Sequence, residues 1–313
     1  MKNKKFKTNF WSVKKYFAIG FILFLFLAIF FLDSKTGFFS HKKIDERDSA
    51  YWTRDKNGIV VGADEIIING SKENCWLMIH GYSSGPGDLK SLGEKISQNF
   101  SDYIYIPRLI GHGEVPSHLL NLTLEDWYLQ IEKIFDSLEK ECLSVNVVGF
   151  SFGGALATKL AENKKVKNIY LISPYFFPKQ NLFKIFDYSF YINLFADKVI
   201  YTKKLKIAQI NSEEFLEEYF SYWNFVLLPV KNSEEFLEKT LDDSKKINES
   251  ILIQHSKKDD TADILGSKIL FGKISSENKE LVLFEKSNHV LLFDYEKEGV
   301  IKNIINFENK NKG

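Results

Sequence analysis

Cysteine is scarce in this chain of 313 residues, which contains only Cys75 and Cys142. Their spacing matches neither a zinc site nor a Cys-x-x-Cys redox pair, so two buried thiols are the default expectation. An excess of one charge is also missing, because 42 Lys and Arg against 41 Asp and Glu give a formal net charge of +1. Without a basic face, nucleic acid is not expected as a partner. The sequence implies no metal and no organic cofactor, and it contains no internal repeat.

One long hydrophobic run is present, and it lies near the N-terminus. Residues 16–32 carry no charge, and as a helix they would be roughly 26 Å long, close to the hydrocarbon core of about 30 Å when Lys15 and Trp11 anchor its end. A cleavable signal peptide would end in small residues, whereas residues 28–32 are bulky. The run therefore predicts an uncleaved transmembrane signal anchor, with a buried soluble helix as the alternative.

Lysines around this run indicate its orientation. Six lysines lie in the basic N-terminal segment 1–15, and only three follow shortly after the run. The positive-inside rule then predicts a single-pass protein with a cytoplasmic N-terminus and an extracytoplasmic catalytic domain. Residues 33–48 are polar and mixed in charge, as expected of a tether, and the folded domain is expected to span residues 49–313.

Short apolar runs alternate with amphipathic stretches through most of this domain. Residues 76–79, 103–106, 145–148, 167–173, 251–254 and 281–284 are expected strands, separated by helical patterns. Such alternation predicts an α/β fold with a mostly parallel central sheet covered by helices on both faces. Residues 175–230 break the pattern, since they are rich in Phe, Tyr and Leu without a clean strand. We expect them to form an inserted helical cap.

The most informative motif is Gly149-Phe150-Ser151-Phe152-Gly153, which follows an apolar strand. In a Gly-x-Ser-x-Gly turn, glycines remove the Cβ atoms that would collide as the chain reverses, and the serine is left at the tip in a strained conformation. A second loop, His80-Gly81-Tyr82, also follows a strand, and we expect it to direct the backbone N–H of Tyr82 into a site above the sheet. Either motif alone is also compatible with an ordinary strand-to-helix turn.

A nucleophilic serine needs an imidazole to accept its proton and a carboxylate to orient that imidazole. His289 follows the last expected strand, and Asp259 follows the strand before it. Ser151, Asp259 and His289 therefore occur in the order serine, acid, histidine, with all three expected at the carboxyl edge of the sheet.

The chain from about residue 49 to 307 resembles the α/β-hydrolase superfamily, closest to its carboxylesterase, monoacylglycerol-lipase and serine-aminopeptidase-like branch. The resemblance rests on four segments: His80-Gly81-Tyr82 with Gly85, Pro107-Arg108-Leu109 with Gly111-His112-Gly113, the Ser151 motif, and Ser256-Lys257-Lys258-Asp259 with Ser287-Asn288-His289.

The resemblance implies a role for each matching residue. Ser151 would be the nucleophile, His289 the general base and then acid, and Asp259 the orienting carboxylate. The backbone N–H groups of Tyr82 and Phe152 would form the oxyanion hole. Two departures leave the acid open. The family usually has glycine at the position of Ser256, and Asp260 and Asp263 are rival acids, with Asp260 the stronger candidate.

These features predict a membrane-anchored serine hydrolase that cleaves esters through an acyl-enzyme. Small-molecule or lipid esters, with short to medium acyl chains or a monoacylglycerol-like structure, are the expected substrates. Peptide, thioester and carbon–carbon bonds stay open as alternatives, as does a non-catalytic binding module with the same fold. The oligomeric state is not predicted. Cys75 and Cys142 introduce strands that this fold places side by side, so a disulfide is a further hypothesis if the domain faces an oxidising compartment.

Overall fold

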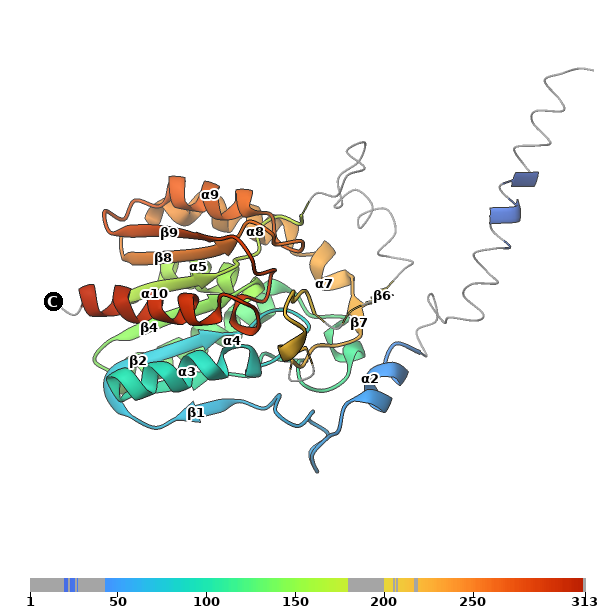
Figure 1. Ribbon diagram of the computed structural model, residues 1–313, viewed down its shortest axis with the longest axis horizontal. Coiled ribbons are helices and arrows are strands. Elements are labelled where there is room, and N and C mark those ends of the chain that lie inside the picture. Colours follow the sequence, from blue (N-terminus) through green and yellow to red (C-terminus); the bar gives the residue numbers. More distant parts are fainter. Residues whose placement is uncertain are drawn as a thin grey trace, which may run out of the picture.

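The computed structural model describes residues 43–179 and 200–311 except 205, 207, 217 and 218, together with residues 20, 21, 23–25 and 27. Its centre is a seven-stranded sheet with the strand order β1-β3-β2-β4-β5-β8-β9, in which only β1 is antiparallel to its neighbour (Figure 1). The strands are β1 Ile66–Ile68, β2 Ser71–Ile79, β3 Asp102–Ile106, β4 Val145–Phe150, β5 Asn168–Ile172, β8 Ser250–Ser256 and β9 Lys279–Phe284.

Two apolar layers hold helices on the two faces of this sheet. One layer packs α3 (Gly87–Phe100) and α10 (Lys297–Lys310) through their buried Leu, Ile, Val and Phe side chains. The other face carries α4 (Leu124–Glu141), α5 (Phe152–Asn163), α8 (Glu234–Asp243) and α9 (Ile264–Lys273) (Figure 1). Because both faces are covered, β4 and β5 are buried along their whole length, as the apolar runs predicted. The predicted α/β-hydrolase fold is confirmed.

The insert between β5 and β8 differs from the helical cap that we expected. Its described part contains a two-stranded antiparallel sheet of β6 (Tyr201–Lys203) and β7 (Asn224–Val226), the short 3-10 helix Glu213–Phe215 and the four-residue α7 (Leu228–Lys231). Strands of three residues are too short to show a two-residue periodicity, so they could not be recognised from the sequence. Residues 180–199 of the expected cap lie outside the described residues.

Part of the segment 33–48, which we assigned to the tether, packs on this insert. Helix α2 (Glu46–Tyr51) begins before residue 49, the expected start of the domain. The buried carboxylate of Asp48 accepts hydrogen bonds from the N–H groups of Trp223 (2.7 Å) and Asn224 (3.1 Å). The side-chain amide of Asn224 donates to the carbonyl oxygen of Ile44 (2.6 Å), whose side chain is also buried. The folded unit therefore includes residues from 44 onward.

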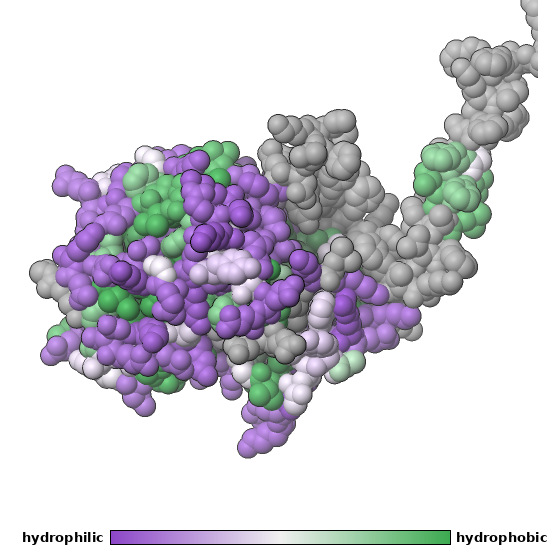
Figure 2. Space-filling model, in the orientation of Figure 1, coloured by the Kyte–Doolittle hydropathy of each residue, from purple (hydrophilic) through white to green (hydrophobic). Residues whose placement is uncertain are grey.

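Most of the predicted membrane anchor, residues 16–32, lies outside the described residues. Those that the structure describes between 20 and 27 are helical and exposed, and they form a hydrophobic surface, whereas the face of the domain seen in Figure 2 is mainly hydrophilic. Within the described part of the chain, no helix has both the length and the apolar character needed to cross a membrane. The anchor stays a prediction.

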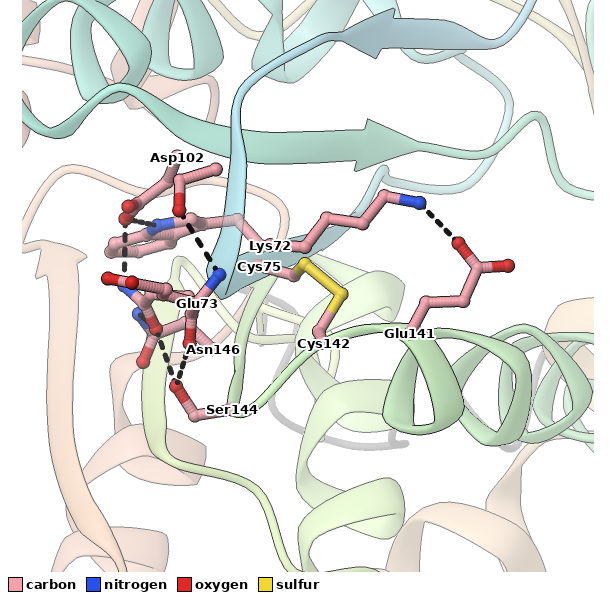
Figure 3. Close-up of a disulfide and its surroundings, with 11 residues drawn as sticks. Lys72, Glu73, Cys75, Asp102, Glu141, Cys142, Ser144 and Asn146 are labelled. Atoms are coloured by element: carbon pink, nitrogen blue, oxygen red, sulfur yellow. Dashed lines mark hydrogen bonds and ion pairs between the residues drawn. A yellow bond between two sulfur atoms is a disulfide. The ribbon is translucent and has the colours of Figure 1, made fainter.

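The two cysteines form a disulfide, so the default expectation of two thiols is wrong. Cys75 lies in β2, whereas Cys142 lies directly after α4 and not on the neighbouring strand (Figure 3). The distance between their Cα atoms is 6.0 Å. Beside the bond, Lys72 pairs with Glu141. This cluster is located at the start of β4, where Cys75 pairs with Val145, at the opposite end of β4 from the loop that carries Ser151.

Candidate active site

Ser151 occupies the sharp turn between β4 and α5. Its φ is +55° and its ψ is −121°, a conformation that L-residues rarely adopt. The flanking glycines are required by close backbone contacts: a Cβ on Gly149 would lie 2.3 Å from the carbonyl oxygen of Gly153, and a Cβ on Gly153 would lie 2.2 Å from that of Ile79. The turn therefore presents the serine hydroxyl at the carboxyl edge of the sheet.

Three strand ends bring the three candidate catalytic side chains together. Ser151 Oγ lies 2.9 Å from His289 Nε2, and His289 Nδ1 lies 2.7 Å from Asp259 Oδ2. The three residues are 7%, 6% and 1% exposed, respectively. Because the carboxylate can only accept, Nδ1 carries the proton and Nε2 is free to accept one from the serine hydroxyl. The structure thus assembles the residues that the sequence order selected.

Asp259 is held as an anion in a buried place. Its Oδ1 accepts hydrogen bonds from the N–H groups of Thr261 and Ala262, both 2.8 Å. Burial alone would raise the pKa of this carboxyl, but electrostatic attraction to His289 and hydrogen bonds from His255 and His289 outweigh it and hold the pKa well below the usual range. His255 Nε2 lies 3.1 Å from Asp259 Oδ2. Sequence reasoning gave His255 no role, since it looked like a residue at the end of a strand.

The rival acids make other contacts. Asp260 Oδ2 accepts from the Asn288 amide at 3.1 Å, and Asp263 caps α9 by accepting from the N–H of Leu265 at 2.9 Å. Ser256 stands where the family usually has glycine, and its hydroxyl donates to the carbonyl of Ser287. That hydrogen bond connects the loop that carries Asp259, which we call the acid loop, to the loop that carries His289. A glycine at position 256 could not form it.

Tyr82 and Phe152 both lie close to the serine. A Cβ on Gly81 would be 3.3 Å from that of Ser151, and the Tyr82 and Phe152 rings have centroids 5.5 Å apart. Phe152 is the first residue of α5, where backbone N–H groups lack intrahelical acceptors. Within the described residues, neither backbone N–H has a hydrogen-bond acceptor in the protein.

Two buried histidines support the loop of Tyr82 from the body of the domain. His80 Nε2 accepts from the N–H of Leu109 at 3.1 Å, and His112 Nε2 accepts from the N–H of Ser83 at 3.3 Å. Burial lowers the pKa of His80 to about 4 and also lowers that of His112, so both rings are neutral and can accept at pH 7. Their positions beside glycine-containing loops were the only sequence signal for this role.

Asp88 supports the same loop from the start of α3. Its buried carboxyl accepts from the N–H of Gly81 at 3.2 Å and from the hydroxyl of Ser84 at 2.5 Å. Burial raises the pKa of Asp88 to about 7, although these hydrogen bonds oppose the shift. Sequence analysis missed this residue because its pattern was that of an ordinary acid in the first turn of a helix.

The insert forms several hydrogen bonds with Ser83, the residue after Tyr82. Ser83 has a φ of +65°. The carbonyl oxygen of Ser83 accepts from the N–H of Tyr222 (2.8 Å) and the hydroxyl of Ser221 (2.9 Å), and its hydroxyl accepts from Lys204 Nζ (2.8 Å). We call these contacts of Lys204, Ser221 and Tyr222 with Ser83 the cap clamp. Since Ser83 follows Tyr82, the clamp fixes the loop that carries a candidate oxyanion donor.

A cavity of about 300 Å³ opens between the catalytic side chains, the Tyr82 loop and the insert. It is lined by Ser151, His289, Tyr82 and Phe152, by further aromatic side chains that include Tyr175 and Phe225, and by three lysines. Within the described residues, no group of three or more His, Cys, Asp or Glu side chains is arranged to hold a metal ion.

The parallel sheet, the serine turn and the Ser-His-Asp contacts define an α/β-hydrolase. Solved structures with this fold are similar over most of the chain. A structure reported for LipS and LipT, two metagenome-derived lipolytic enzymes, has a TM-score of 0.72 at 22% identity and covers 80% of this chain and 99% of its own. The monoacylglycerol lipase of Paleococcus ferrophilus has a TM-score of 0.67 at 16% identity, with 79% and 98% covered.

Sequence comparison places the chain within one family of this superfamily. A carboxylesterase of Bacillus subtilis (strain 168) is 20% identical over 237 residues, which are 75% of this chain and 92% of that protein. Residues 71–296 match the serine aminopeptidase S33 family. The chain belongs to that family, in the branch of the α/β-hydrolases that contains carboxylesterases and monoacylglycerol lipases, and it is a serine hydrolase.

Proposed function

We propose that this protein is a carboxylic ester hydrolase that acts through an acyl-enzyme on Ser151. The observation that carries the proposal is the continuous hydrogen-bonded relay from Ser151 Oγ through the His289 ring to Asp259, with distances of 2.9 and 2.7 Å. An alcohol becomes an effective nucleophile only when a positioned base takes its proton, and the relay supplies that base in the required tautomer.

The chemistry runs in two halves. Ser151 Oγ attacks the ester carbonyl as His289 Nε2 takes the hydroxyl proton, and the imidazolium then gives this proton to the departing alkoxide. Water next attacks the acyl-serine with His289 again as the base, which releases the acid and restores the serine. Asp259 stays ionised throughout and stabilises the imidazolium, in agreement with its lowered pKa.

The negative oxygen of each tetrahedral intermediate would be held by the N–H groups of Tyr82 and Phe152. Loss of one such donor typically costs about 3–4 kcal/mol in the transition state. Support comes from the lack of a protein acceptor for either N–H among the described residues, since a donor already in use would be unavailable to the oxyanion.

Short to medium acyl esters and monoacylglycerol-like lipids are the proposed substrates. The cavity of about 300 Å³ presents Tyr82, Phe152, Tyr175 and Phe225, which suit an acyl chain. Carboxylesterase and monoacylglycerol lipase relatives support the same choice.

The test is hydrolysis of p-nitrophenyl esters from acetate to laurate by the full chain in detergent, beside Ser151→Ala. We expect turnover that vanishes in the variant, with an optimum at short or medium chains. Turnover that persists in Ser151→Ala would refute the proposed nucleophile. A folded wild-type protein that hydrolyses none of these esters would refute the proposed substrate class.

Amide hydrolysis at a peptide N-terminus is a second candidate, favoured by the name of the matched family. The carboxylate of Asp260 lines the cavity and offers a partner for an α-ammonium group, although three lysines line it too. Aminoacyl-p-nitroanilides in the same assay decide between the two, because an aminopeptidase would hydrolyse them faster than the esters relative to the uncatalysed rates.

We also propose that residues 16–32 anchor the enzyme in a membrane, with the N-terminus cytoplasmic and the catalytic domain outside. The lysine distribution supports this orientation. So does the Cys75–Cys142 disulfide, since such bonds persist mainly in oxidising compartments. Protease treatment of intact cells should remove the domain, and deletion of residues 1–42 should release it from the membrane fraction. A domain that is protected until the cells are lysed would contradict the orientation.

A further inference from the structure

The cavity has an unbalanced charge. Lys179, Lys204 and Lys206 all line it, together with Ser151 and His289, whereas Asp260 is the one carboxylate among its described lining residues. Its Oδ2 accepts a hydrogen bond from the neutral Asn288 amide at 3.1 Å, and its single negative charge does not balance three ammonium groups. The space beside the nucleophile is therefore cationic, which a cavity for purely neutral esters does not require.

These three lysines form no ion pair within the described residues, in contrast to several other lysines of the chain. Many lysines pair with a neighbouring carboxylate, as Lys164 does with Asp136 (2.6 Å) and Lys310 with Glu280 (2.9 Å). Within the part of the chain that the structure describes, no carboxylate lies within 4.0 Å of the ammonium of any of the three cavity lysines. Their charge is available to a ligand.

Lys204 is the most constrained of the three. Its ammonium donates to the hydroxyls of Ser83 (2.8 Å) and Ser221 (2.6 Å), which leaves one of its three donors. Burial lowers the pKa of Lys204 to about 8, and the attraction of Asp48 and Asp88 only partly offsets that effect. Both acids already accept hydrogen bonds from other groups. Asp48 accepts from the N–H groups of Trp223 and Asn224, and Asp88 accepts from the N–H of Gly81.

The lysines lie on two segments that border the cavity. Lys204 and Lys206 follow β6, and Lys206 is exposed. Lys179 is fixed to the acid loop, because its N–H donates to the carbonyl oxygen of Thr261 at 2.9 Å. A substrate with its carbonyl at Ser151 would thus meet positive charge at the wall of the cavity.

We infer that the enzyme prefers esters that carry an anionic group, a carboxylate or a phosphate, which Lys204, Lys206 and Lys179 bind while the ester carbonyl lies at Ser151. This inference rests on the proposed ester hydrolysis and specifies its substrate class. It requires no chemical step beyond those already described, because the anion is bound and not transformed.

The test uses matched pairs of esters that differ in one group. On the acyl side, p-nitrophenyl hexanoate is compared with mono-p-nitrophenyl adipate, in which a carboxylate replaces the terminal methyl. On the alcohol side, monohexanoylglycerol is compared with monohexanoylglycerol phosphate. The readout is the ratio of kcat/KM for the anionic ester to that for its neutral partner, measured with the full chain in detergent. The two arms distinguish a carboxylate on the acyl chain from a phosphate on the alcohol.

We expect a ratio of about ten in at least one arm, which falls to about one in Lys179→Met/Lys204→Met/Lys206→Met. Lys204→Arg keeps the charge and should keep most of the ratio. Lys90→Met, which removes a surface charge on α3, is the control and should leave the ratio unchanged. Added salt should lower the anionic kcat/KM and leave the neutral one nearly constant.

Three results would overturn the inference. Neutral esters hydrolysed through Ser151 with ratios at or below one in both arms would reject it while the proposed esterase stands. A high ratio that survives the triple variant and added salt would reject the lysines as its source. Absence of turnover for all four esters by the folded protein would remove the proposed function, and the inference with it.

Discussion

The two sides of the cavity are held in different ways. On one side, which we call the catalytic floor, Ser151, Asp259 and His289 stand at the ends of β4, β8 and β9, and parallel strand pairing places them. On the other side, the cap clamp fixes Ser83 through polar contacts between segments far apart in the chain. The floor therefore follows from the topology of the sheet, whereas the clamp depends on a few individual side chains.

This difference suggests a division of labour. The floor supplies the nucleophile and its base, which other chains with this sheet and serine turn can share. We expect the clamp to determine how the oxyanion loop is held, and the three cavity lysines to influence which substrates fit. Four substitutions test the division, starting with the largest expected effect.

Asp259→Asn should disable the catalytic floor by removing the carboxylate that orients His289. The amide no longer fixes the protonated Nδ1 of His289 or stabilises its imidazolium, so kcat should fall by about 10⁴-fold, equivalent to about 5 kcal/mol. Steady-state kinetics on a p-nitrophenyl ester measures the loss. Asp260→Asn is the matched control, and it should change kcat less than threefold. Equal losses in the two variants would mean that the acid assignment is wrong.

Asp88→Asn should change how stability depends on pH. The folded-state pKa of Asp88 is raised from 3.8 to about 7, so the folded protein keeps a proton that the unfolded chain releases. The stability from this group is complete below pH 3.8 and is lost as the pH rises towards 7. Relative to Asp88→Asn, the wild type should lose about 3 kcal/mol of unfolding free energy between pH 4 and pH 7.

Urea unfolding of both proteins across this range gives that difference. The opposite effect of the low pKa of His80 is present in both and cancels. The exposed Glu277→Gln, measured in the same way, serves as the control for the loss of a carboxylate from the surface. A constant difference between the wild type and Asp88→Asn would contradict the raised pKa.

Cys75→Ala with Cys142→Ala should separate stability from catalysis. The disulfide closes a loop of 67 residues, and its loss should lower the unfolding free energy by about 3 kcal/mol. Because it is located beside the start of β4, away from the Tyr82 loop, kcat/KM at 25 °C should stay within twofold. Thermal unfolding and ester kinetics of the same preparation check both parts. A large loss of activity in the folded variant would show that the two ends of the sheet are coupled.

Asp48→Ala should loosen the cap clamp without changing the contacts among the residues of the catalytic floor. It removes the acceptor of two backbone N–H groups at the start of β7, which costs about 2 kcal/mol of stability. Since β7 follows Ser221 and Tyr222, we expect kcat to fall about tenfold through the oxyanion loop. Glu46→Ala, an exposed change in the same helix, is the control. If Asp48→Ala loses stability but keeps kcat, the clamp does not position the loop.

The sequence predicted the floor well and the clamp poorly, for physical reasons. Apolar runs and the glycines around Ser151 are local signals, and the order serine, acid, histidine locates the site once the sheet is known. Asp48, by contrast, looked like part of a polar tether, because its partners Trp223 and Asn224 are more than 170 residues away.

The disulfide was hard to predict for a similar reason. Cys142 reaches Cys75 from the end of a helix, a geometry that strand order alone does not give. Asp88 and His112 act through burial, which the pattern of single residues does not reveal.

Labelling of the full chain with a fluorophosphonate, followed by peptide mass mapping, tests the central claim most directly. The account predicts one adduct, on Ser151, with rapid labelling in the wild type, none in Ser151→Ala and slow labelling in His289→Ala. An adduct on another residue, or none on a protein that unfolds cooperatively, would contradict the assignment of Ser151 and His289 as nucleophile and base.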